Sequence, residues 1–352
     1  MNLDRKTLIS WLEETDQDRL QTLYDEAYRV KLSTVGDKVY LRGLVEISNI
    51  CRKNCLYCGI RRDNRAAGRY MISSEDVLQA ADFAFREGYA SMVIQGGERQ
   101  DRAFIDMITS LLKEIKRRYP LGITLSLGEQ PQEVYREWLD AGAHRYLLRI
   151  EASGRELYGK IHPSDADHSY DVRVRALRDL RSCGYQVGTG VMVGLPFQSA
   201  ADLADDLMFF KDMDIDMCGM GPYLEHSMTP LYQYRRLLVP QERRLQLSVT
   251  MVALLRLLMP DINIAATTAM QAIDPYGREK AIMAGANVLM PNLTLSEVRE
   301  EYQIYQNKPG VGEDAAVSSS RTERRLAEMN IPIGYGEWGD SRHYGKKTGR
   351  TP

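Results

Sequence analysis

The stretch YLRGLVEISNICRKNCLYC, residues 40–58, places a strand-like run directly before three closely spaced cysteines. Cys51, Cys55 and Cys58 fall within eight residues. Thiolates are soft ligands that select zinc, copper(I) or iron–sulfur clusters. A structural zinc site uses four ligands, usually in two pairs, and here a triplet stands without a partner pair or a nearby His. The pattern favours a cubane cluster with one open iron, which can chelate a small molecule through its amine and carboxylate. A zinc site completed by a distant residue, or a chance grouping in a loop, is the alternative.

The rest of the composition is that of a globular protein whose thiols stay reduced. The chain has 352 residues, 44% of them hydrophobic and 27% charged, and a formal charge of −2. This balance argues against a disordered chain, and it gives no support to nucleic acid or a membrane as a partner. The first residues, MNLDRKTLIS, contain no apolar segment, so we expect no signal peptide and a cytoplasmic location. Two isolated cysteines, Cys183 and Cys218, are expected to be structural.

Strand-like runs alternate with amphipathic helical patterns from residue 39 onward. Eight such units over about 255 residues predict an α/β protein with a (β/α)8 TIM-type barrel. No GxGxxG turn follows the first strand, which favours a closed barrel over an open nucleotide-binding sheet. We expect N-terminal helices over 1–38, the barrel over 39–305, and a C-terminal cap and tail over 306–352, with one helix at 322–329 and a loose stretch after 334. The eight expected strands are 40–48, 91–97, 123–128, 145–151, 186–194, 217–223, 263–270 and 287–292.

Barrel enzymes carry their chemistry at the carboxyl ends of the strands, and several strand ends here are polar. The cysteine triplet follows the first strand, and the second strand ends in Gly96, Gly97 and Glu98, where glycines allow a close backbone approach. Arg149 and Glu151 share one face of the fourth strand, as a structural ion pair or as ligand contacts. The seventh strand carries small and hydroxylated residues, including Thr267 and Thr268, which suggests room for an internal ligand.

The spacing Cys-x3-Cys-x2-Cys, with Tyr57 just before the last Cys, resembles the radical S-adenosylmethionine (SAM) superfamily. The resemblance implies that Cys51, Cys55 and Cys58 hold a [4Fe–4S] cluster and that its open iron binds the methionine part of SAM. One electron from the cluster would then cleave SAM to methionine and a 5′-deoxyadenosyl radical. The same resemblance implies that Gly96, Gly97 and Glu98 contact the amino group of SAM.

Further segments resemble the HydE family of [FeFe]-hydrogenase maturases, from about Asp37 to Tyr305. They include TLSLGE (124–129), RYLLRIE (145–151), GPYLEHSMTPL (221–231), ATTAM (266–270) and GANVLMPN (285–292). This resemblance implies an organometallic iron–cysteine–carbonyl–cyanide substrate, delivered by a partner maturase, with a reductant protein as a further possible partner. It implies cofactor contacts by Tyr57, Glu151 and Arg173. The pocket residues that it implies are Arg42, Thr124, Arg149, Met217, Thr267, Thr268, Met290, Tyr302 and Tyr305.

One feature departs from that family, and three rival functions stay open. Many HydE proteins carry a second cysteine set near the C-terminus, but residues 306–352 contain no Cys, so we expect no second cluster. A methylornithine synthase-like mutase has a similar barrel and would abstract hydrogen from lysine. Biotin synthase needs cysteines on several barrel strands, and the second, third and fifth strands have none. A non-catalytic iron–sulfur carrier would also use three thiols and an open iron.

Overall fold

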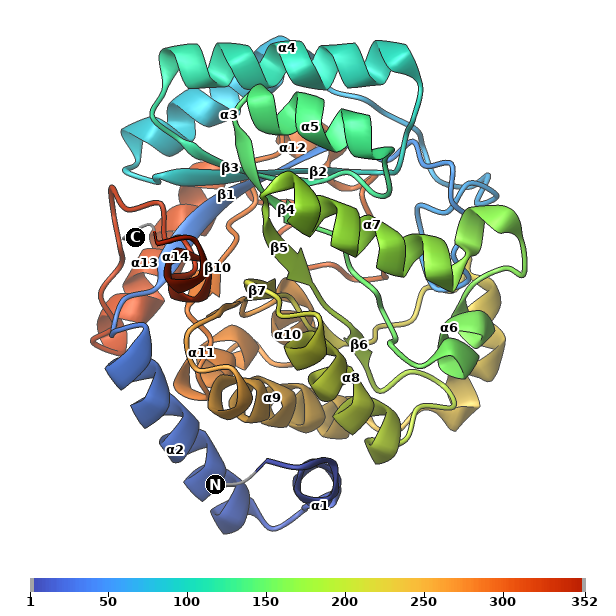
Figure 1. Ribbon diagram of the computed structural model, residues 1–352, viewed down its shortest axis with the longest axis vertical. Coiled ribbons are helices and arrows are strands. Elements are labelled where there is room, and N and C mark those ends of the chain that lie inside the picture. The colour runs from blue at the N-terminus through green and yellow to red at the C-terminus, as the bar shows by residue number, and fades with distance from the viewer. Residues whose placement is uncertain (1–2, 350–352) are drawn as a thin grey trace.

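The computed structural model describes residues 3–349, in which eight parallel strands form a barrel surrounded by helices (Figure 1). The strands follow the order β10-β1-β2-β3-β4-β5-β7-β9, and a single bridge between Ala265 and Val288 joins the two ends. This arrangement confirms the predicted (β/α)8 barrel. The strands are β1 Tyr40–Ser48, β2 Ser91–Gly96, β3 Gly122–Ser126, β4 Ala143–Leu147, β5 Gln186–Thr189, β7 Met217–Cys218, β9 Asn263–Ile264 and β10 Val288–Leu289.

Two of the predicted strands are broken near their carboxyl ends. Each resumes as a short strand, β6 (Met192–Val193) after β5 and β8 (Gly221–Pro222) after β7, and these two pair in parallel. The break lies where two glycines meet, because a Cβ on Gly190 would stand 1.9 Å from the carbonyl oxygen of Gly219. Only glycine permits that approach.

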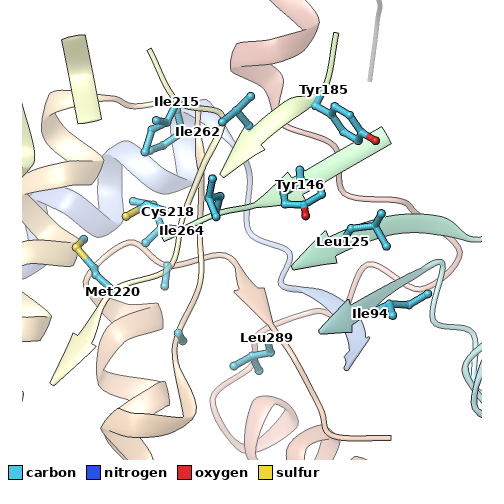
Figure 2. Packing of buried hydrophobic residues seen from close by; sticks show 14 of the residues in the cluster. Ile94, Leu125, Tyr146, Tyr185, Ile215, Cys218, Met220, Ile262, Ile264 and Leu289 are labelled. Carbon is cyan, nitrogen blue, oxygen red and sulfur yellow. The ribbon is translucent and has the colours of Figure 1, made fainter. Parts of the chain in front are cut away.

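Helices cover the outer surface of the barrel, with apolar side chains from the strands packed beneath them. Figure 2 shows this packing at Ile94, Leu125, Tyr146, Ile264 and Leu289, all of them buried. Alternate residues of the strands therefore face outward, and their neighbours face the lumen. The helices between strands are α3 Ser74–Arg86, α4 Arg102–Arg118, α5 Gln132–Asp140, α6 Arg155–Ile161, α7 Tyr170–Cys183, α8 Ala200–Asp212, α9 Gln241–Leu258, α10 Thr268–Ile273 and α11 Gly277–Met283.

The N-terminal segment forms two helices on one side of the barrel. Helix α1 (Arg5–Glu13) packs against α8, and α2 (Gln17–Thr34) packs against α9. Each begins with an Asp side chain that accepts from a backbone N–H of its first turn, which is a favoured N-cap. None of the described helices is both long and apolar enough to cross a bilayer.

The C-terminal segment closes the amino end of the barrel, and this corrects the prediction of a loose tail. After α12 (Ser296–Arg299) and α13 (Ala315–Glu328), residues 334–341 enter the bottom of the lumen, and α14 (Arg342–Thr348) follows. The carbonyl oxygen of Trp338 accepts from Arg145 at 2.9 Å, and that of Gly339 accepts from Arg42 at 2.9 Å. Buried arginines need such acceptors, so this segment is held by the barrel itself. We call residues 334–341 the plug.

The seventh strand is also shorter than predicted. Strand β9 ends at Ile264, and Thr267 is already the N-cap of α10. Ala265 and Ala266 keep a backbone bond to β10, from Ala266 N to Val288 O at 2.9 Å. The predicted strand 263–270 is therefore a short strand followed by the first turn of a helix.

Candidate functional site

The three cysteines lie in the loop after β1, at the carboxyl end of the barrel, and all of them line one internal cavity. This cavity has a volume of about 350 Å³ and lies along the barrel axis. Backbone bonds hold the loop in a compact shape, including Arg62 N to Lys53 O at 2.8 Å and Leu56 N to Ile161 O at 3.0 Å. The sequence thus places its metal ligands where a parallel barrel presents its loops.

The environment of the thiols fits an iron–sulfur cluster better than a single metal ion. All three thiols are free, and among residues 3–349 no three His, Cys, Asp or Glu side chains are grouped closely enough to bind one ion. Burial, and then the nearby Cys51, raise the pKa of Cys55 to about 12, and burial raises the pKa of Cys58 well above its usual range. Buried thiols this close together need a cationic group to exist as thiolates, and a cluster held at separate corners by Cys51, Cys55 and Cys58 supplies it.

The Gly-Gly-Glu turn after β2 packs directly on the cysteine loop. A Cβ on Gly97 would lie 2.4 Å from the carbonyl oxygen of Ile50, so only glycine fits there. The backbone N–H of Glu98 donates to Cys51 Sγ at 3.3 Å. Glu98 Oε1 is buried without a hydrogen-bond partner, and burial raises the pKa of this carboxyl. An unpaired buried carboxylate oxygen is costly, so it suits a ligand that brings an ammonium group.

Arg149 and Glu151 both line the cavity and bind each other. Arg149 Nε and Nη2 donate to the two carboxylate oxygens of Glu151 at 2.8 and 2.9 Å, and Arg149 also donates to the carbonyl oxygens of Gly219 and Val191. Glu151 has a φ of 66°, a left-handed conformation that is rare for a residue with a side chain. Such strain clusters at functional sites. The ion-pair reading of the sequence thus holds, and the pair also faces the lumen.

Arg173, on α7, belongs to a buried charged network that the sequence reasoning missed in part. Its guanidinium donates to Glu129 and, at 2.5 Å, to the carbonyl oxygen of Arg149. Glu129 also accepts from Lys53 at 2.8 Å. Burial alone would raise the pKa of Glu129, but Arg173 and Lys53 outweigh it and hold this pKa below its usual value. The signal available beforehand was a Glu closing the segment TLSLGE after β3.

The cavity wall opposite the cysteines is formed by the last two barrel strands and the segment that follows them. Five of the predicted pocket residues lie there, and a second buried pair was missed. Glu46, on β1, binds Lys308, whose Nζ stands 5.0 Å from the ring centroid of Tyr302. The signal beforehand was an acidic residue facing inward in the otherwise apolar strand YLRGLVEIS. The predicted residues on this wall are Thr267, Thr268, Met290, Tyr302 and Tyr305.

Three other predicted pocket residues lie outside the cavity lining, which corrects that part of the prediction. Arg42 and Thr124 are fully buried nearer the amino end of the barrel, beside the plug. Arg42 donates to Met217 Sδ at 2.7 Å, and Arg145 donates to Thr124 Oγ1 at 3.4 Å. The side chains face inward as their parity requires, but they lie deeper than the cavity. Tyr57, Gly96, Gly97, Glu98, Glu151 and Arg173, the predicted cofactor contacts, all line the cavity.

Comparisons with known proteins agree with this geometry. A family model described as Radical SAM superfamily matches residues 45–210. The [FeFe] hydrogenase maturase subunit HydE of Thermotoga maritima is 44% identical over 305 residues, which cover 86% of this chain and 84% of that protein. A 3-methylornithine synthase of Methanosarcina acetivorans is 25% identical over 289 residues, or 81% of this chain and 77% of that protein.

Solved structures show the same fold. The crystal structure of methylornithine synthase (PylB) superposes with a TM-score of 0.80 at 21% identity, and the match covers 99% of this chain and 97% of that one. The sequence match to the HydE protein is the stronger of the two by 44% to 25% identity. The chain therefore belongs to the radical SAM superfamily and, within it, to the HydE family.

Proposed function

We propose that this protein is an [FeFe]-hydrogenase maturase that acts on an iron–cysteine precursor carrying carbonyl and cyanide ligands. The observation that carries the proposal is the 44% identity to a HydE protein together with a cavity into which all three cysteines open. A [4Fe–4S] cluster in this cavity, once reduced, supplies the electron that cleaves bound SAM to methionine and a 5′-deoxyadenosyl radical. A carrier protein would need no closed lumen lined by charged pairs.

The chain's own residues divide the cavity into a cofactor part and a substrate part. Glu98, through its unpaired carboxylate oxygen, is suited to the ammonium group of SAM, and Arg173 is suited to its carboxylate because a guanidinium binds carboxylates in a bidentate way. Glu151 lies between this part and Arg149. The substrate part is the opposite wall, with Thr267, Thr268, Met290, Tyr302 and Tyr305. Walls that exclude water keep a radical from side reactions.

The second function to test is that of a methylornithine synthase-like mutase, because the structure of such an enzyme superposes over nearly the whole chain. Its substrate is an amino acid, whereas the maturase substrate is an iron complex. The two functions therefore differ in which added molecule changes the fate of SAM.

The experiment is an anaerobic cleavage assay with reconstituted protein, dithionite and SAM. We expect 5′-deoxyadenosine, or an adenosyl–cysteine adduct, to change in amount or form only when the iron–cysteine precursor is added. Stimulation by lysine instead would support the mutase. No cleavage of SAM under any of these conditions would support the carrier.

A further inference from the structure

We infer that the depression outside Cys51 is the surface on which an acidic one-electron carrier protein docks to reduce the cluster. This inference rests on the proposed function, since only a redox-active cluster needs such a partner. Cys51 lines both the internal cavity and an open depression on the outside, formed with Ile50, Arg52, Arg99, Gln100 and Asp101. Cys55 and Cys58 line only the internal cavity among the pockets described. Cys51 is thus the ligand nearest to the outside, and electron transfer is fastest over the shortest path.

The rim of the depression combines exposed apolar side chains with arginines. Ile50 and Met71 are 38% and 45% exposed, and Arg99 lies between this apolar pair and the depression, with its Nη1 3.3 Å from Met71 Sδ. Arg52 bridges to Gln100 at 2.6 Å. Arg69 donates to the carbonyl oxygen of Asn49, next to Ile50, at 2.8 Å. We call Ile50, Arg52, Arg62, Arg65, Arg69, Met71 and Arg99 the entry surface.

The charge of the cysteine loop indicates the kind of partner. Residues 50–70 contain six Lys and Arg against one acidic residue, whereas the whole chain has 46 against 48. Three carboxylates bind to the entry surface, and each is matched by one of its arginines: Asp63 by Arg62, Asp101 by Arg99, and Asp167 by Arg52. Arg65 and Arg69 form no ion pair with any described carboxylate, so their charges remain available.

A mixed surface of this kind fits a transient protein partner. Opposite charge steers a partner to the surface and raises the association rate by about 10- to 1,000-fold. The exposed Ile50 and Met71 then provide a small apolar contact at the centre. One electron passes to the cluster in each encounter, so the carrier is oxidised by one electron as the cluster is reduced by one. The loop lies on the opposite side of the barrel from α13 (Figure 1).

The test uses reconstituted full-length protein and a reduced acidic flavodoxin as the probe. Stopped-flow spectroscopy measures the rate of cluster reduction, and calorimetry measures the affinity of the complex. For the unmodified protein we expect both to fall steeply as salt rises from about 0.05 to 0.5 M, because the screening length shrinks over this range. In the variant Arg62→Glu/Arg65→Glu, whose side chains are exposed, we expect the low-salt reduction rate to fall at least about 10-fold.

A matched control reverses two exposed cations elsewhere, Lys113→Glu on α4 and Arg324→Glu on α13, with the same change in net charge. We expect this control to keep the unmodified rate within about two-fold. The spin count of the reduced cluster after excess dithionite shows separately that each variant carries an intact cluster. A flavodoxin rate that is independent of salt in the unmodified protein, or an equal loss in both double variants, would overturn the inference. Dithionite-driven SAM cleavage tests the proposed function by itself, so the two ideas can fail separately.

Discussion

At the residue scale, the site depends on a few side chains that no neighbour can replace. Cys51, Cys55 and Cys58 are the only thiols on the cavity, while Cys183 is half-buried with its Sγ 3.8 Å from the carbonyl oxygen of Gln132. A three-ligand cluster has no spare ligand, so the loss of one thiolate removes a third of its attachment to the protein.

The first prediction concerns these ligands. Cys51→Ala, Cys55→Ala or Cys58→Ala is expected to abolish stable cluster binding, with iron content falling to the level of unreconstituted protein. Iron analysis and visible absorbance after anaerobic desalting provide the measurement. Cys183→Ala is the control and should bind as much iron as the unmodified protein. Full iron content in any of the three variants would remove that cysteine from the ligand set.

The second prediction concerns the strained Glu151. Glu151→Gln keeps the size of the side chain but removes the charge that Arg149 binds and that we assign to SAM recognition. A charged hydrogen bond contributes about 1.5–3 kcal/mol, so SAM affinity should weaken about 10- to 100-fold at unchanged iron content. Equilibrium dialysis with reconstituted protein measures this. The control is Glu156→Gln, an 86% exposed carboxylate that pairs only with Lys160; equal affinities for both variants would contradict the assignment.

At the element scale, the plug decides how deep the lumen is. Asp340 binds Arg145 at 2.8 Å and His144 at 3.1 Å, and the ring of Trp338 lies 4.8 Å from that of His144. These contacts fill the amino end of the barrel, so the cavity begins above them. The barrel is therefore open for chemistry at one end only.

The third prediction is a pH dependence that comes from the plug. Burial, and then the charge of Arg145, lower the pKa of His144 to about 4 from a usual value of 6.5. Between these two values the unfolded chain binds a proton that the folded chain does not. Stability should therefore be complete above pH 6.5 and fall as the pH drops toward 4, by up to about 3 kcal/mol.

His144→Gln removes this titration. We expect the melting temperature of the unmodified protein to fall more between pH 7 and pH 4.5 than that of the variant, measured on metal-free protein so that cluster loss does not contribute. Parallel curves would show that His144 does not titrate differently in the folded and unfolded states.

At the scale of the whole molecule, the number of clusters separates this chain from relatives with two. The fourth prediction is an iron content of about four atoms per chain after reconstitution, the content of one [4Fe–4S] cluster. The reason is that residues 306–352 contain no Cys to hold a second cluster. Iron and sulfide analysis together with spin quantitation provides the measurement. A value near eight would require other ligands and would contradict the prediction.

The sequence by itself determined the features that depend on local spacing. The positions of Cys51, Cys55 and Cys58 and the alternation of strands and helices are properties of short segments, and the predicted ligands and barrel followed from them. The Gly96–Gly97–Glu98 turn and the Arg149/Glu151 pair were likewise found because each lies at a strand end.

Only the tertiary structure decided depth along the barrel axis and contacts between distant segments. Strand parity shows that Thr124, Arg42 and Met217 face inward, but not how far from the cluster each lies, because depth depends on the stagger between neighbouring strands. The Glu46–Lys308 pair and the plug join residues more than 200 positions apart, or 193 positions in the case of Arg145 and Trp338. No local pattern encodes such a pairing, since its energy arises only when the closed barrel removes both partners from water.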